Sequence, residues 1–169
     1  MLFRSGNGNV VNGRGIAYLR YNNTITYVAA VAEVAVNKAT GAIKVTRICL
    51  AHDCGEMVNP DGVANQVEGG VLQTVSRTLM ETVKWDREKV LSVDWATYPI
   101  ARFTDMPKVD VALLNRPGQP AWGAGEPTAC AIPGAIANAV FDATGVRLRS
   151  LPFTPEKVKA ALAAGPARA

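Results

Sequence analysis

The sequence has few of the residues on which disulfide frameworks and metal clusters depend. Its 169 residues include one histidine and three cysteines, and no two of the cysteines form a C-x-x-C pair. Three cysteines cannot all pair within one chain, so reduced thiols are expected, and neither a disulfide framework nor a zinc knuckle is supported. Long apolar runs are also missing, because no window approaches the roughly 20 residues that span a bilayer.

Charge of one sign is not concentrated anywhere along the chain. Lysine and arginine number 18 against 14 acidic residues, for a formal net charge of +4. Because no basic stripe interleaves with aromatic residues, this excess indicates a solvated surface rather than a nucleic-acid-binding face. The sequence also lacks G-x-S-x-G, P-loop and G-x-G-x-x-G motifs. Serine hydrolase, nucleotide hydrolase and dinucleotide-binding functions therefore have no support.

Composition divides the chain into one domain and two short ends. Hydrophobic residues make up 49% of the sequence, enough for a sizeable core. We predict a disordered or artefactual segment at 1–12, one domain at 13–163 and a frayed tail at 164–169. Residues 6–15 hold four glycines and three asparagines, a composition typical of a loop. Possible codons for residues 2–5 match the end of a common sequencing adapter, as expected for a metagenomic reading frame that opens inside a gene.

The pattern of apolar residues predicts strands first. β-Branched and aromatic residues predict strands over 16–21 and 24–36. Residues 43–50 form the second arm of a hairpin around a turn that contains Gly41, and their imperfect alternation predicts a bulge. Short β-like segments are expected at 82–85, 89–92 and 108–114.

Three helices are expected between and after these strands. Apolar residues at steps of three and four predict a helix that ends near residue 80, with Asn59 as its N-cap and Pro60 as its first residue. A second helix is predicted over about 128–143, with a kinked first turn or a later start because of Pro133. Thr154 caps a third helix that runs to about residue 163. Strands, helix, strands and helices in this order favour an α+β fold, a mixed sheet with hairpin strands packed by two to three helices.

Glu126 is the first candidate for chemistry. It lies in Trp122-Gly-Ala-Gly-Glu126-Pro127, on a glycine-flanked loop directly before a predicted helix. Glycines allow a ligand to approach the backbone, and a carboxylate there could act as a general base. The alternative is a carboxylate that merely complements the helix dipole. On spacing alone, this structural alternative is favoured.

Gln66 is the second candidate, because it precedes Glu68-Gly69-Gly70 within a predicted helix. A side-chain amide there could hydrogen-bond a polar cofactor. Each glycine costs about 1 kcal/mol of helix stability relative to alanine, which indicates that another backbone or a ligand lies close. Tight packing over a neighbouring strand explains the glycines equally well.

His52, Asp53 and Cys54 could each bind a metal ion, but adjacent residues of an extended segment point in opposite directions. With no second histidine in the sequence, structural or hydrogen-bonding roles are favoured for all three. No metal ligand is predicted.

Several short motifs together resemble a known family. In order they are Asp53-Cys-Gly, Asn59-Pro, Gln66-Val-Glu-Gly-Gly, Gly123-Ala-Gly-Glu-Pro, Asn138-Ala, Ala143-Thr-Gly and Arg147-Leu-Arg. Their order and spacing resemble the C-terminal part of the molybdopterin-binding large subunit of the xanthine oxidase family of molybdenum hydroxylases. The resemblance covers about residues 13–163 and is closest to isoquinoline 1-oxidoreductase beta-subunits and aldehyde-dehydrogenase-like members.

This resemblance implies a partial molybdenum-cofactor-binding domain from an enzyme that oxidises an aldehyde or an N-heterocycle with oxygen from water. Glu126 would be the catalytic general base. Gln66 and the backbone of Gly123, Ala124 and Gly125 would contact the molybdenum-molybdopterin cofactor, which in bacterial members is usually the cytosine dinucleotide form. Many family members carry glycine where this chain has Thr74, so we do not carry over the family's pterin contact at that point to this chain.

The resemblance also implies partners. They are the N-terminal part of the same subunit, a small subunit that carries two [2Fe-2S] clusters, and a small-molecule substrate, with no nucleic acid and no membrane span. Relatives are found in the bacterial cytoplasm or periplasm. Segments outside the chain would leave an apolar face exposed and the chain alone inactive. The alternatives are a non-catalytic binding or interaction domain and an inactive truncated product. The catalytic interpretation requires Gln66 and Glu126 to face one cleft.

Overall fold

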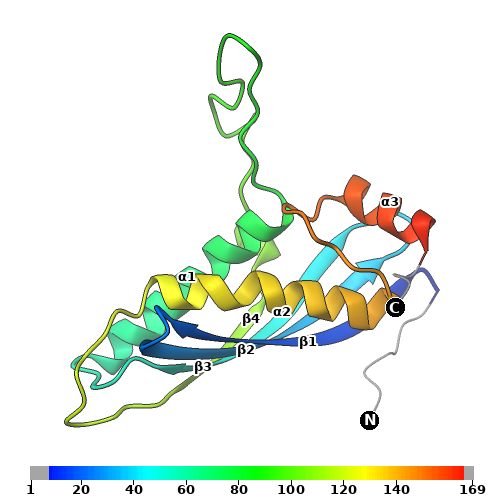
Figure 1. The fold of residues 1–169 in the computed structure, drawn as a ribbon. Helices are drawn as coiled ribbons and strands as arrows, with labels where there is room; N and C mark the ends of the chain where they lie inside the picture. Colours follow the sequence, from blue (N-terminus) through cyan, green and yellow to red (C-terminus); the bar gives the residue numbers. More distant parts are fainter. Residues whose placement is uncertain (1–7, 166–169) are drawn as a thin grey trace.

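The computed structural model describes residues 8–165 as a two-layer α+β domain with helices on one face of a four-stranded sheet (Figure 1). The strands are β1 (Val10–Tyr21), β2 (Ile25–Asn37), β3 (Ile43–Asp53) and β4 (Lys108–Leu113), in that order across the sheet. β1, β2 and β3 are antiparallel neighbours, whereas β4 runs parallel to β3. The predicted α+β class and mixed sheet are therefore confirmed.

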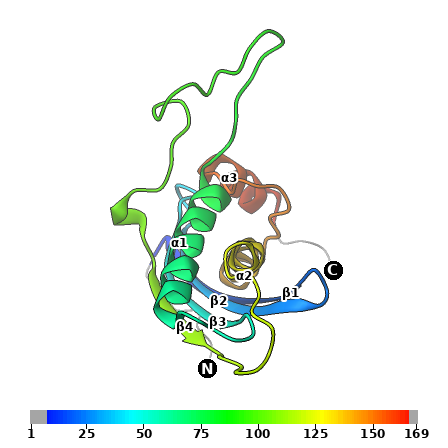
Figure 2. The same cartoon turned by 90° about the vertical axis from the view of Figure 1, so that its left-hand side faces the viewer.

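Two long helices cover the same face of this sheet (Figure 2). α1 (Pro60–Leu79) contacts β3 and β4, and α2 (Glu126–Thr144) contacts β1 and β2. A third helix, α3 (Pro155–Ala164), and a one-turn helix, η1 (Phe103–Asp105), complete the fold. The core lies between sheet and helices, and its fully buried large side chains include Ile48, Ile132, Ile136, Val28, Val34 and Val71.

The loop predicted over residues 6–15 is wrong from Val10 onward, because β1 begins there. The glycines that suggested a loop serve helix packing instead. A Cβ atom on Gly13 would lie 2.2 Å from the carbonyl oxygen of Ala139, and one on Gly15 would lie 2.1 Å from the Ala139 nitrogen. Only glycine lets the α2 backbone approach β1 this closely. The rest of the predicted N-terminal segment, residues 1–7, lies outside the described residues.

The β2–β3 hairpin follows the prediction closely. Gly41 occupies its turn with a φ of 80°, a left-handed conformation that favours glycine. The predicted bulge is present as a register shift between Glu33 and Val34. β4 also matches its predicted position.

The β-like segments predicted at 82–85 and 89–92 are wrong, since only an isolated bridge joins Trp85 to Val90. This part of the chain projects from the body of the domain as a long loop (Figure 1). Trp85 and Trp95 are 71% and 70% exposed on it. The residues have strand-forming side chains, but no strand of the described chain lies beside them to complete a sheet.

All three predicted helices are present, and they differ from the prediction only at some of their ends. Asn59 caps α1 through a hydrogen bond from the Gly62 amide, and Thr154 caps α3, as predicted. α2 begins at Glu126, so the predicted start at residue 128 or later is wrong. Pro127 fits the first turn because its missing N–H would have no partner there, and Pro133 lies inside the helix without ending it. Ala164 belongs to α3 rather than to a frayed tail, and residues 166–169 lie outside the described residues.

The opposite face of the sheet carries no helix of the described chain. Two rows of side chains cross it, one from Ile16 through Val31 and Cys49 to Asp110, the other from Tyr18 through Ala29 and Ala51 to Ala112. Ile16 and Tyr18 are 63% and 64% exposed. The predicted exposed apolar face is therefore present on this side.

Candidate functional site

A cavity of about 720 Å³ lies where the first turn of α2, the middle of α1 and the end of β1 meet. Its lining comprises Tyr21, Gln66, Gly69, Gly70, Gln73, Arg77, Gly125, Glu126, Ala129 and Cys130. Gln66 and Glu126 therefore border one cavity, although they are far apart in the sequence. This is the geometry that the catalytic interpretation requires.

Gln66 projects from the exposed side of α1, and its side-chain amide has no hydrogen-bond partner among residues 8–165. The amide lies against Gly125, where a Cβ atom would come within 3.4 Å of its nitrogen. One turn of helix thus presents a free donor and acceptor beside the loop that leads to Glu126.

The two glycines that follow Gln66 have different roles. A Cβ atom on Gly70 would lie 3.3 Å from the methyl group of Thr128, so this glycine allows α1 to pack against α2. A Cβ atom on Gly69 would meet nothing within 4 Å. Packing therefore explains Gly70 but not Gly69, which leaves an open stretch of helix surface on the cavity wall.

Glu126 is the first residue of α2 and is exposed to the cavity. The hydroxyl of Tyr21, at the end of β1, donates a hydrogen bond to its Oε2 atom. This hydrogen bond, followed by burial and the charge of Glu126, raises the pKa of the Tyr21 phenol above its usual value. The phenol therefore remains a donor across the neutral range. Sequence reasoning missed Tyr21, because only the β1–α2 contact brings it to Glu126.

The loop before Glu126 is held from the same hairpin end. The hydroxyl of Thr26 donates to the carbonyl oxygen of Gly123 over 3.1 Å. Ala124 lines a neighbouring cavity of about 270 Å³ together with Gln66 and Trp122. Of the predicted backbone contacts, Gly125 thus lines the main cavity, Ala124 the neighbouring one, and Gly123 neither of them.

Arg77 brings a positive charge to the cavity wall, and its Nη2 atom donates to Oε1 of Gln73 over 3.3 Å. Neither side chain was predicted, although both lie on α1 at the helical spacing that follows Gln66 and Gly69. Thr74 does not reach the cavity. It is 2% exposed and donates to the Gly70 carbonyl oxygen over 2.7 Å, so its hydroxyl is satisfied within the helix.

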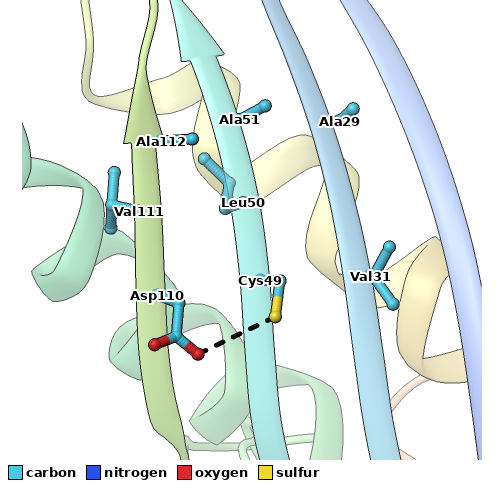
Figure 3. A pocket seen from close by; sticks show the side chains of 8 residues that line it. All are labelled: Ala29, Val31, Cys49, Leu50, Ala51, Asp110, Val111 and Ala112. Carbon is cyan, nitrogen blue, oxygen red and sulfur yellow. Dashed lines mark hydrogen bonds between the residues drawn. The ribbon is translucent and has the colours of Figure 1, made fainter.

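A second cavity lies on the uncovered face of the sheet and is not a candidate for chemistry. Figure 3 shows its lining from β2, β3 and β4, which is mostly small and apolar. Its polar groups are the Cys49 thiol and the Asp110 carboxylate, and Arg47 pairs with that carboxylate. The hydrogen bond from Arg47 holds the pKa of Asp110 below its usual value.

His52, Asp53 and Cys54 do not gather around a common point. His52 is buried, with Nδ1 3.5 Å from the Thr128 hydroxyl, whereas Asp53 pairs with Arg116. Burial lowers the pKa of His52 and raises that of Cys54. Among residues 8–165, no cluster of three His, Cys, Asp or Glu side chains could hold a metal ion. No helix in that range is both long and apolar enough to cross a membrane.

The main cavity thus combines a free amide, a carboxylate with a fixed hydrogen-bond donor, a guanidinium group and bare helix backbone. These groups suit a polar, partly anionic ligand, and the volume is that of a small-molecule or cofactor site. The fold and the cavity together describe an α+β domain with a site that could hold a polar ligand.

Comparison with known proteins gives the family. Residues 11–107 match the model of the molybdopterin cofactor-binding domain, which is more than half of the chain. The chain belongs to this family. Gln66 lies inside the matched residues and Glu126 lies beyond them.

The chain is also similar to single subunits of known enzymes. It is 46% identical to one of the subunits of nicotinate dehydrogenase from Pseudomonas putida, over 92% of this chain and 14% of that protein. It is 36% identical to the beta-subunit of isoquinoline 1-oxidoreductase from Brevundimonas diminuta, over 83% and 18% respectively. The chain therefore spans less than a fifth of the length of these relatives.

Solved structures agree with the fold. Quinoline 2-oxidoreductase from Pseudomonas putida 86 matches 82% of this chain and 19% of its own chain, with a TM-score of 0.75 and 29% identity. Aldehyde oxidoreductase from Desulfovibrio gigas matches 82% and 15%, with a TM-score of 0.72 and 34% identity. The resemblance seen in the sequence motifs is confirmed at the level of family and fold.

Proposed function

We propose that this chain is the C-terminal part of the catalytic subunit of a molybdenum hydroxylase, with Glu126 as the general base. The observation that carries the proposal is the single cavity bordered by Gln66 and Glu126. In a non-catalytic binding or interaction domain, Gln66 and Glu126 would not need to lie beside the same cavity. The chain alone, spanning less than a fifth of its relatives, would be inactive.

The residues of the cavity fit a molybdopterin group. Gln66 would hydrogen-bond the pterin through its unpartnered amide, Gly69 would let the ligand lie against the helix backbone, and Arg77 would pair with a phosphate. When bound, the molybdenum cofactor supplies the two-electron acceptor for the oxidation. Because bacterial members of the family usually carry the cytosine dinucleotide form of the cofactor, we propose that form here, which nucleotide analysis of the released cofactor would identify.

Glu126 would act on a proton. Its Oε2 atom accepts the hydrogen bond from Tyr21, so its second carboxylate oxygen is free to face the cavity. That oxygen would take the proton from the water-derived nucleophile that attacks the substrate carbon. The first turn of α2 keeps the carboxylate near the positive end of the helix dipole.

An N-heterocyclic aromatic compound is the substrate class that we propose, with aldehydes as the second class. Nicotinate, isoquinoline and quinoline appear in the names of three of the similar proteins, and aldehyde in a fourth. The nicotinate and isoquinoline enzymes are each named as having more than one kind of subunit, which supports a multi-subunit enzyme here. We propose that a separate small subunit carries the [2Fe-2S] clusters that remove the electrons.

The test is Glu126→Gln in the complete subunit. An amide cannot take a proton, so turnover of nicotinate, isoquinoline or an aldehyde should fall by about 100-fold or more while molybdenum content stays unchanged. Gln66→Ala is the matched binding variant, and it should lower molybdenum content instead. Full turnover in Glu126→Gln, or full molybdenum content in Gln66→Ala, would contradict the corresponding role.

A further inference from the structure

The end of the β1–β2 hairpin touches the loop that leads to Glu126 at two points. Tyr21 reaches the Glu126 carboxylate, and Thr26 reaches the Gly123 carbonyl oxygen. The two side chains flank the turn between β1 and β2, at residues 22–24. They therefore contact the start and the end of the segment that presents Glu126.

The backbone of this hairpin end is irregular in a way that serves both contacts. Arg20 pairs with Tyr27 and Tyr21 pairs with Ile25, so Thr26 is an extra residue in β2. Thr26 has a φ of 43°, a left-handed conformation that is unfavourable for a β-branched residue. It is also fully buried. A strained residue of this kind persists only where its surroundings require it, and such residues cluster at functional sites.

The bulge determines where the two hydroxyl groups point. In a regular strand, neighbouring side chains alternate between faces, and inserting one residue re-aims those beside it. Here the inserted Thr26 turns its hydroxyl onto the Gly123 carbonyl oxygen, while Tyr21 meets the first residue of α2. Gly123 and Gly125 give the intervening loop few side-chain contacts of its own, and a Cβ atom on Gly123 would meet nothing within 4 Å.

We propose that Tyr21 and Thr26 are positioning residues, which hold the Glu126 carboxylate and its glycine-rich loop in the orientation needed for proton transfer. This inference rests on the proposed role of Glu126. Tyr21 holds the Oε2 atom, and Thr26 anchors the loop at Gly123. The raised pKa of the Tyr21 phenol agrees with donation to a carboxylate, and the facing groups are Glu126 and Cys130.

The contact itself can be measured without any cofactor. In the 169-residue chain labelled with 13Cζ-tyrosine, the Tyr21 signal at neutral pH should lie downfield of the Tyr18 signal. Tyr18 is the matched control, since it is 64% exposed on the uncovered face of the sheet. Glu126→Gln should move the Tyr21 signal toward that of Tyr18. A Tyr21 signal that does not respond to Glu126→Gln would overturn the proposal.

A double-mutant cycle in the complete subunit tests whether the contact matters for catalysis. Tyr21→Phe should lower kcat about tenfold or more with little change in KM or in molybdenum content, because misplaced catalytic groups cost rate rather than binding. In the Glu126→Gln background, Tyr21→Phe should have no further effect, because a positioning residue acts only through its target. Equal losses in both backgrounds would show a merely structural role and sink the idea. Tyr18→Phe should leave kcat unchanged.

Thr26 is tested by removing its hydroxyl at constant shape. Thr26→Val should lower kcat in the same way as Tyr21→Phe, whereas Thr26→Ser, which keeps the hydroxyl, should restore it. Equal kcat values for these two variants would contradict the role of Thr26. These results are separable from the proposed function: full turnover in Glu126→Gln would refute the base, while the tyrosine signal would still report whether the contact exists.

Discussion

At its C-terminal end, α2 lies directly on β1, and at its N-terminal end it borders an open cavity. Glycines occur in both regions, but they do opposite things. Gly13 and Gly15 are required because the helix backbone would overlap any Cβ atom there, whereas a Cβ atom on Gly69 would project into empty space. One helix therefore joins a packed region, which fixes the fold, to an open region, which leaves room for a ligand.

This contrast teaches that a glycine in a helix or strand is not evidence of a ligand by itself. Gly69 and Gly70 are neighbours, yet only Gly70 has a packing partner, the Thr128 methyl group. What separates the two roles is the space around the missing Cβ atom, and that space is formed by residues far away in the sequence.

The strongest test of the packed region is Gly15→Ala. The added Cβ atom would lie 2.1 Å from the Ala139 nitrogen and 2.4 Å from the Ala135 carbonyl oxygen, and backbone atoms of a helix cannot move aside separately. We expect the free energy of unfolding to fall by about 3 kcal/mol or more, at the upper end of overpacking costs. Urea unfolding of the chain measures the loss, and failure to fold counts as the same result. An unchanged free energy of unfolding would show that α2 does not pack as described.

The boundary between the two regions can be tested at His52, the sole histidine. It is buried beside Thr128 in the first turn of α2, and burial lowers its pKa. The unfolded chain therefore takes up a proton first, at a pH of about 6.5. The contribution of neutral His52 to the free energy of unfolding is fully present above this pH. As the pH falls below it, the free energy of unfolding should decrease by at most about 1.4 kcal/mol per pH unit.

Urea unfolding between neutral pH and about pH 5 would reveal this dependence, and the His52→Gln variant should lose that part of the slope. Proton NMR of the single histidine ring provides an independent measurement. Titration of His52 at its ordinary pKa would mean that water from the cavity reaches it, so that the open region extends deeper than the structure indicates.

The smallest expected effect lies in the open region. Gly69→Ala should raise the free energy of unfolding by up to about 1 kcal/mol, because alanine favours the helix and the new methyl group meets nothing. In the complete subunit the same change should lower molybdenum content. Gly70→Ala is the matched control, and its contact with Thr128 at 3.3 Å should cancel the gain. Destabilisation by Gly69→Ala would show that the space beside it is not open.

Several parts of the fold were predictable because they depend on neighbours in the sequence. Asn59 and Thr154 cap their helices, Gly41 forms its turn, and apolar spacing marks the buried side of α1. The start of β1 was not predictable in this way. Residues 6–15 have the composition of a loop, but residues 10–15 are in β1, and their strand conformation depends on pairing with β2 and on the approach of α2.

The residues of the candidate site also fall into two groups, those that a sequence motif identifies and those that only tertiary packing brings to the cavity. Gln66 and Glu126 were found by motif, and the Gln66→Ala and Glu126→Gln variants test their proposed roles. Tyr21, Gln73 and Arg77 were missed, because nothing in their local sequence distinguishes a cavity-lining side chain from an exposed one. For Tyr21, a helical or strand pattern could not have revealed a partner on α2.

The residues alone were enough to predict the β2–β3 hairpin with its turn, the caps of α1 and α3, and the family to which the chain belongs, since these depend on local spacing and on motifs that can be read in order. Only the tertiary structure decided that Gln66 and Glu126 share a cavity, that Gly13 and Gly15 are packing residues, and that Tyr21 donates to Glu126. The physical reason is that contacts between side chains from distant segments depend on how α1, α2 and the sheet pack together. A missing Cβ atom and a hydroxyl group acquire a role only from what that packing brings next to them.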